Sequence, residues 1–216
     1  MRRGVAVLFA CSLMMAGCGR AADSSATISA IAPSADTSKD ESSSDRRLIV
    51  YFSLAGEQYG VGTVSEGNTA IVADMIAEKT GADTFEIVAE NSYPTDLKSL
   101  FEVAKEEQDS DALPDYVGDV KNWDDYSTIY LGYPLWYDTL PGIVVHFLED
   151  HDFSGKTIYP FNTSGGEGLL DTVNTIKSIA RNGDVRDGLT IRGTDAQNNR
   201  ETAEEAVDAW LKEADQ

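Results

Sequence analysis

Short apolar runs alternate with longer amphipathic patterns along most of this chain. Runs dense in β-branched and aromatic residues predict buried strands at 47–53, 83–88, 127–133, 157–161 and, with an interruption, 185–191. Apolar residues that recur at helical spacing predict helices at 69–80, 95–108, 139–150, 168–181 and 195–213. Strands that alternate with helices indicate an α/β domain, in which helices cover both faces of a doubly wound, five-stranded parallel sheet and make three layers.

The first 45 residues follow a different pattern. Arg2 and Arg3 precede an apolar stretch, 4–17, whose length suits a signal-peptide core better than a membrane-spanning helix. It ends in "LMMAGC", which resembles the bacterial lipoprotein processing site and implies that residues 1–17 are removed and that Cys18 carries a lipid. The alternative is an ordinary secretory peptide cleaved nearby. Residues 18–45, rich in Ser, Ala and Asp and without an aromatic residue, predict a disordered tether.

The folded domain, residues 46–216, is strongly acidic. It holds 13 Lys or Arg and 32 Asp or Glu, a formal charge of −19. Nucleic acid is therefore excluded as a partner, because phosphates need a basic surface. Cationic or neutral partners fit better, although simple solubility explains the charge equally well. His146 and His151 have no cysteine near them, so no dedicated metal site is expected.

The segment 53–69 follows the first predicted strand and starts a helix. Its end, Gly62 to Thr69, reads G-x-x-x-x-G-N-T, where a P-loop would have a lysine in place of Asn68. The N–H groups at a helix start can hold a phosphate, with Ser53, Asn68 and Thr69 as neutral side-chain donors. A single phosphate needs no lysine, so the loop favours a monophosphate. The alternative is a Gly-rich loop whose hydroxyl caps the helix.

Two further strand-to-helix loops have unusual compositions. "YPLWYDTLP" (133–141) places Trp136 and Tyr137 after the third predicted strand, which suits a planar, π-rich ligand or else a lid over the core. "NTSGGEG" (162–168) follows the fourth strand and supplies backbone donors without bulk, as an ordinary turn would also do. In the strand order 2-1-3-4-5 these loops and the first would form one rim at the carboxyl edge, where such sheets bind ligands. Together they suggest a flat ring system that carries one phosphate.

With "IVYFS…GNTAIVADMIAEKTGAD", "LGYPLWYDTLP" and "FNTSGGEGLLDT" in this order, the domain resembles the bacterial flavodoxin family. The resemblance implies the strand order 2-1-3-4-5 and non-covalent binding of FMN. One departure is the insertion "EQYGVGTVSE" (57–66), within which Tyr59 could fold over the ligand as part of a flap. The residues that the resemblance assigns to FMN are Ser53, Ala55, Gly67, Asn68 and Thr69 for the phosphate, and Pro134, Leu135, Trp136, Tyr137, Thr163, Ser164, Gly165 and Gly166 for the ring.

The expected function is electron transfer by a flavoprotein that its lipid anchor holds at the extracytoplasmic face of a bacterial cell membrane. Its partner would be a redox protein or a small-molecule electron acceptor. Two alternatives stay open: an FMN-dependent NAD(P)H or quinone reductase, and an interaction module without flavin on the same fold. No sequence feature names the electron donor or the oligomeric state.

Overall fold

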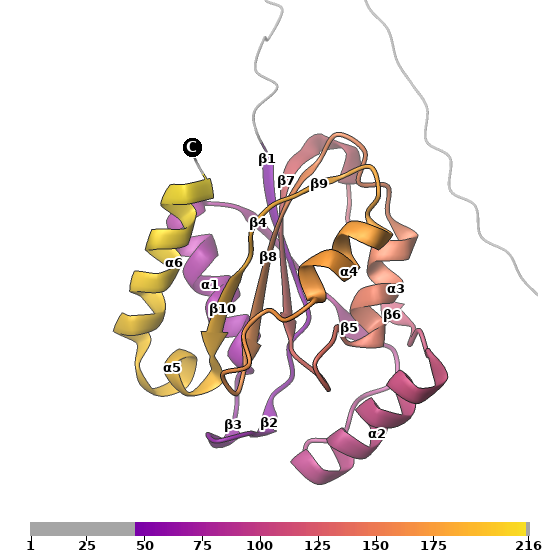
Figure 1. Ribbon diagram of the computed structural model, residues 1–216, viewed down its shortest axis with the longest axis vertical. Helices are drawn as coiled ribbons and strands as arrows, with labels where there is room; N and C mark the ends of the chain where they lie inside the picture. The colour runs from indigo at the N-terminus through magenta and orange to yellow at the C-terminus, as the bar shows by residue number, and fades with distance from the viewer. Residues whose placement is uncertain (1–45, 215–216) are drawn as a thin grey trace, which may run out of the picture. The chain divides into compact units, whose positions relative to one another are not determined.

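The computed structural model describes residues 46–214 (Figure 1). The strands are β1 (Arg46–Tyr51), β2 (Gly56–Gln58), β3 (Gly62–Val64), β4 (Asp83–Glu86), β5 (Val88–Ala89), β6 (Tyr116–Val117), β7 (Tyr126–Pro134), β8 (Thr157–Ser164), β9 (Asp184–Val185) and β10 (Leu189–Arg192). The helices are α1 (Asn68–Thr80), α2 (Leu97–Ser110), α3 (Gly142–Asp150), α4 (Thr172–Ile179), α5 (Gly193–Asn198) and α6 (Arg200–Ala214), with a 3-10 turn at Trp123–Asp125.

A parallel sheet forms the middle layer, in the order β10-β8-β7-β1-β4, with the short β9 beside β8. Numbered along the chain, the five main strands have the order 2-1-3-4-5, as predicted. Helices α1 and α6 cover one face of the sheet, and α3 and α4 cover the other (Figure 1). The predicted three-layer α/β fold is confirmed.

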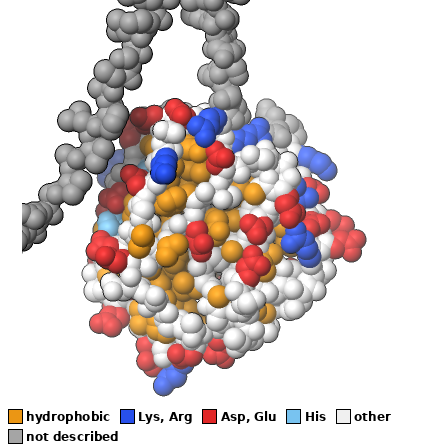
Figure 2. Space-filling model, turned by 180° about the vertical axis from the view of Figure 1, so that it is seen from behind, with side chains coloured by type: hydrophobic (Ala, Val, Ile, Leu, Met, Phe, Trp, Pro, Cys, Tyr) orange, Lys and Arg blue, Asp and Glu red, His pale blue; other side chains and the backbone are white. Residues whose placement is uncertain are grey.

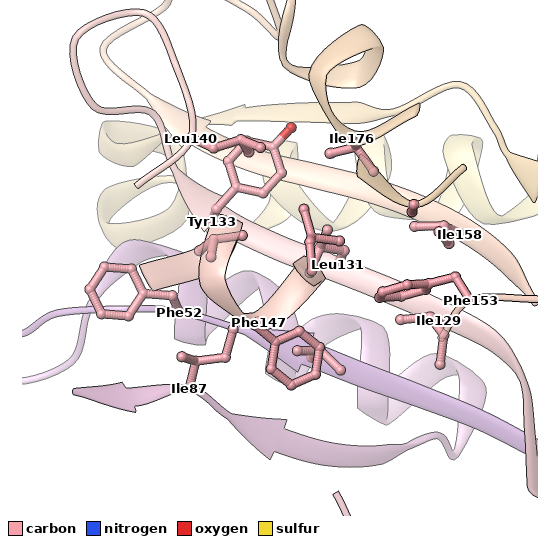
Figure 3. Packing of buried hydrophobic residues seen from close by; sticks show 14 of the residues in the cluster. Phe52, Ile87, Ile129, Leu131, Tyr133, Leu140, Phe147, Phe153, Ile158 and Ile176 are labelled. Carbon is pink, nitrogen blue, oxygen red and sulfur yellow. The ribbon is translucent and has the colours of Figure 1, made fainter. Parts of the chain in front are cut away.

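Each face of the sheet has its own hydrophobic core, because successive side chains of a strand point to opposite faces. Ile49 of β1 packs with Val72 and Met75 of α1, whereas its neighbour Val50 belongs to the core under α3. Figure 3 shows this second core, in which Phe147 of α3 lies over the sheet and Tyr133 lies near the carboxyl end of β7. The two cores hold both helical layers on the sheet and so set the position of its loops.

The predicted helix 139–150 begins only at Gly142, after the N-cap Pro141, and two other predicted helices differ more from those in the structure. The helix expected at 168–181 begins only at Thr172, because Leu170 adopts a left-handed backbone conformation (φ 49°) that an α-helix cannot contain. The helix expected at 195–213 is divided at Asn199, whose extended φ of −142° separates α5 from α6. By contrast, Gly81 ends α1 in the left-handed conformation, as expected of a C-cap glycine.

The insertion 57–66 is not an irregular loop but a hairpin, in which β2 and β3 pair antiparallel. It projects from the carboxyl edge of the sheet, at the foot of the domain in Figure 1. A second antiparallel pair, β5 with β6, extends from the end of β4.

The surface is acidic, as the composition requires. Figure 2 shows, on the face opposite to that of Figure 1, acidic side chains scattered around a band of hydrophobic ones. The predicted signal peptide (1–17), the lipidated Cys18 and the tether (18–45) lie outside the described residues. Within residues 46–214, no helix has the length and apolar character needed to span a membrane.

Candidate functional site

Three loops meet at the carboxyl edge of the sheet, because β1, β7 and β8 are neighbours there. Thr163, near the end of β8, joins all three loops. Its carbonyl accepts a hydrogen bond from the N–H of Leu135 in the second loop (2.9 Å), and its hydroxyl lies 2.8 Å from that of Thr69 in the first. Both threonine side chains are buried. The rim predicted from loop composition is therefore a connected structure.

The first loop is closed around Gly67, the N-cap of α1. Ser53 accepts a hydrogen bond from the N–H of Ala70 through its hydroxyl oxygen (3.0 Å) and so caps the helix. A Cβ on Gly67 would lie 2.3 Å from that oxygen and 2.4 Å from the carbonyl oxygen of Leu54. Only glycine permits this approach, which sets the start of α1 against the end of β1. Ala55, the residue after Leu54, takes no part in this contact and is exposed.

Asn68 and Thr69 form the first turn of α1, but their side chains act differently. The amide of Asn68 donates to Gln58 of the hairpin (3.2 Å) and accepts from Gln197 of α5 (3.0 Å). Asn68 thus fastens the hairpin, and what it offers the rim is its backbone N–H. The hydroxyl of Thr69 pairs with that of Thr163, and one of the two protons of this pair remains available for a further acceptor.

The second loop contains a tight turn. After Pro134, which ends β7, Trp136 and Thr139 exchange two backbone hydrogen bonds, and Tyr137 and Asp138 between them have φ of 44° and 65°. These angles are those of a type I′ turn. The turn directs the two aromatic side chains apart.

Trp136 stays at the rim, whereas Tyr137 is drawn away from it. The Trp136 ring is half-buried and makes edge contacts with Phe52 (5.4 Å between centroids) and Tyr93 (5.2 Å). The Tyr137 ring packs on Phe101 of α2, and its hydroxyl donates to the Phe101 carbonyl (3.0 Å).

The third loop is open, and a charged side chain from another strand lies beside it. The hydroxyl oxygen of Ser164 accepts from the N–H of Gly166 (3.2 Å), and Gly165 and Gly166 are exposed. The guanidinium of Arg192, at the end of β10, lies 3.3–3.5 Å from where a Cβ of Gly166 would be. No ion pair holds Arg192 within residues 46–214. On the other side, a carboxylate oxygen of Glu167 lies 3.1 Å from the Cβ position of Gly165.

A buried acceptor lies beneath this loop. The side-chain amide of Asn162 donates to the carbonyl of Gly168 (2.9 Å), while its Oδ1 has no hydrogen-bond partner in the part of the chain that the structure describes. Buried polar atoms without a hydrogen-bond partner are rare, and a donor would stabilise this buried oxygen. Asn162 belongs to the motif of the third loop, but sequence reasoning did not single it out.

Tyr93 and Tyr133, both near the rim, remain neutral at physiological pH. Burial raises the pKa of Tyr133 to about 12, and burial also raises the pKa of Tyr93. The hydroxyl of Tyr133 donates to that of Thr172 (2.8 Å). Burial raises the pKa of Glu107, which accepts a hydrogen bond from Tyr93. Hydroxyls with such pKa values serve as hydrogen-bond donors rather than as acids or bases.

Besides Asn162, sequence reasoning missed two contributors to the rim. Tyr93 packs against Trp136 from the β5–α2 connection, and Arg192 reaches the third loop from β10. Neither belongs to a motif. The position of Arg192, directly after the last predicted strand, was the one available signal, since that strand also ends at this edge.

A family model described as flavodoxin matches residues 47–213. No curated protein matches the chain. Among solved structures, an inferred flavoprotein from Bacteroides eggerthii is 26% identical, with 77% of this chain and 96% of that chain covered and a TM-score of 0.60. A second, from Bacteroides uniformis, is 26% identical, with coverage of 77% and 97% and a TM-score of 0.59.

The fold alone is shared with a flavoprotein from Lactobacillus acidophilus, solved in complex with FMN. It is 19% identical, with coverage of 72% of this chain and 97% of that one, and the TM-score is 0.53. The similarity spans almost the whole length of all three proteins, so the described domain corresponds to a complete domain of this fold.

Proposed function

The chain belongs to the flavodoxin family, and from this premise we propose that it binds FMN non-covalently at the three-loop rim and transfers electrons. FMN is the cofactor that the family and the FMN complex of the Lactobacillus flavoprotein support. The observation that carries the proposal is the junction at Thr163, which joins the start of α1 to both loops beyond β7 and β8.

The residues of the rim fit FMN. The helix start offers backbone N–H groups and the positive end of the helix dipole to a phosphate, with the Thr69 hydroxyl beside them. Residues 53–69 contain no Lys or Arg, which suits one terminal phosphate better than a triphosphate. Trp136 and the open third loop, with its exposed glycines, would hold a flat ring. When bound, the flavin supplies the redox chemistry, and the protein binds it, orients it and shields it from water.

The test compares ligands that share parts of FMN. The purified full-length protein should bind FMN far more tightly than riboflavin, and ATP negligibly, in fluorescence and calorimetric titrations. Equal affinity for FMN and riboflavin would show that the helix start holds no phosphate. Steady-state oxidation of NADH or NADPH by the loaded protein would indicate a reductase instead of an electron carrier.

We propose further that Cys18 is lipidated and that the domain works at the extracytoplasmic face of a bacterial membrane, with a cationic or neutral electron partner. The support is the sequence "LMMAGC", the polar segment after it and the charge of −19. In the native host, Cys18→Ala should remove the protein from the membrane fraction or leave its precursor unprocessed. Unchanged partitioning would refute the anchor.

A further inference from the structure

A flat ring can be contacted by aromatic side chains on both of its faces, but the second and third loops supply such a side chain for only one face. Trp136 is half-buried at the second loop, but Tyr137, its neighbour in sequence, is bonded to Phe101 and turned towards α2. The third loop, 164–168, contains no aromatic residue.

Tyr59 lies beside the third loop, where a second aromatic side chain could contact the ring. It lies in the turn of the β2–β3 hairpin, and its ring atoms Cδ1 and Cε1 lie 3.2 Å from the position of a Cβ on Gly165. The ring therefore lies against the backbone of the third loop at Gly165, closer than an added Cβ would allow without a small shift. Yet 67% of Tyr59 remains exposed to solvent. A single exposed aromatic side chain is common on protein surfaces, so the position of Tyr59 against the third loop, and not its exposure, is what points to a ligand.

The hairpin holds Tyr59 in this place from a firm base. At the base, a Cβ on Gly56 would lie 2.5 Å from the carbonyl oxygen of Thr95, and Glu57 binds the start of α2 through the N–H of Leu97 (3.0 Å). Gln58 donates to the carbonyl of Leu54 (3.0 Å) and accepts from Asn68 (3.2 Å). These contacts tie the residues directly before Tyr59 to the first loop and to α2. The hairpin is thus a fixed arm rather than a freely swinging flap.

We infer that Tyr59, and not Tyr137, is the second aromatic residue that contacts the flavin ring. This inference rests on the proposed function. The insertion would thereby serve as a binding arm, which supplies from the first loop the aromatic side chain that the third loop lacks. A flavin that lies against Tyr59 would cover its exposed ring.

The test uses Tyr59→Ala, with Tyr137→Ala as the matched control and Tyr59→Phe as the conservative variant. Both tyrosines are exposed and both lie in loop turns, so the alanine variants should fold, which far-UV circular dichroism verifies. Titration of the full-length protein with FMN and with riboflavin gives each affinity, and the fluorescence of the bound flavin reports stacking, because a stacked aromatic ring quenches it.

Tyr59→Ala should weaken FMN about 5- to 150-fold, the range of one contact between an aromatic side chain and a stacked ring, and weaken riboflavin by a similar factor. The bound flavin should become more fluorescent. Tyr59→Phe and Tyr137→Ala should resemble the wild type in affinity and fluorescence.

Unchanged or tighter binding by Tyr59→Ala would overturn the inference, since Tyr59 would then only fill the space of the ligand. So would a loss confined to FMN, which would assign Tyr59 to the phosphate, or a larger change in Tyr137→Ala than in Tyr59→Ala. These results leave FMN binding by the wild type intact. If the wild type binds no flavin, the proposed function itself fails and the inference with it.

Discussion

Thr69 and Thr163 make one buried hydroxyl pair that serves both stability and the rim. Thr69→Val keeps the shape but removes the hydroxyl, so a buried group loses its partner. We expect the free energy of unfolding to fall by about 1–3 kcal/mol and FMN affinity to fall roughly 10- to 150-fold. Urea unfolding and FMN titration measure the two effects.

Thr80→Val is the control for this substitution, because the Thr80 hydroxyl donates to the Ile76 carbonyl at the opposite end of α1 (2.7 Å). It should alter stability and leave FMN binding unchanged. If Thr69→Val loses stability but binds FMN like the wild type, the hydroxyl pair is structural only.

Arg192 and Glu167 place opposite charges on the third loop. A reduced flavin gains negative charge, so Arg192 should favour reduction and Glu167 should oppose it. Arg192→Gln should therefore lower the midpoint potential and Glu167→Gln should raise it. An interaction of about 1 kcal/mol corresponds to about 20 mV for a two-electron couple.

Redox titration of the FMN-loaded variants measures these shifts. Arg181→Gln is the charge-matched control, because Arg181 follows α4 towards the opposite, amino-terminal edge of the sheet, where solvent ions screen its charge. A shift for Arg181→Gln as large as that for Arg192→Gln would mean that net charge, and not the local guanidinium, sets the potential.

At the scale of elements, the 136–139 turn contains two non-glycine residues in the left-handed region. Such a conformation costs an ordinary side chain about 1–2 kcal/mol, and Asp tolerates it better than most. Asp138→Gly should raise the free energy of unfolding by up to about 1 kcal/mol, and Asp138→Ala should lower it by a similar amount. Urea unfolding decides the signs; a destabilising glycine and a neutral alanine would contradict the described turn.

The main elements could be predicted because each carries enough residues for its hydrophobic period to be read. The nine residues of β7 and the eight residues of β8 form apolar runs that the sequence reveals. By contrast, β2, β3, β5 and β6 contain two or three residues each and form only because a partner strand is near. The start of α4 was misplaced, because the left-handed backbone of Leu170 does not change the helical spacing of the apolar residues around it.

The site could be located from loop composition because parallel strands bring their carboxyl ends to one edge. The direction of the side chains in the site could not be predicted in this way. Tyr137 turns to α2 because its own φ is positive and because Phe101, far away in sequence, offers a carbonyl. Asn68 faces Gln58 and Gln197, partners that exist only once the hairpin and α5 are in place.

At the scale of the whole molecule, excess negative charge disfavours the compact state at neutral pH. Glu107 adds a separate, local cost, because burial raises its pKa in the folded state above that in the unfolded state. The contribution of the Glu107 carboxyl group to the free energy of unfolding is fully present below the unfolded pKa, near 4.5. It is lost as the pH rises through the folded pKa. At pH 7 the ionised carboxylate therefore destabilises the domain.

Glu107→Gln keeps an acceptor for Tyr93 without this charge. It should be more stable than the wild type at pH 7, and the difference should shrink as the pH falls towards 4 in urea unfolding experiments. The exposed neighbour Glu106→Gln is the control for net charge alone. An advantage for Glu107→Gln that is the same at both pH values would exclude ionisation as its cause.

The junction at Thr163 also limits how descendants of this protein can diverge. An added or deleted residue at 67–69, 134–135 or 163 would misalign two loops at once, because each of these segments is bonded to another through Thr163. Residues 60–66, which follow Tyr59 in the hairpin, lie outside that junction, so a lineage can lengthen or shorten this part and keep the rest. Among descendants, we expect insertions and deletions to accumulate there, and the base of the hairpin and the spacing of the other loops to be inherited unchanged.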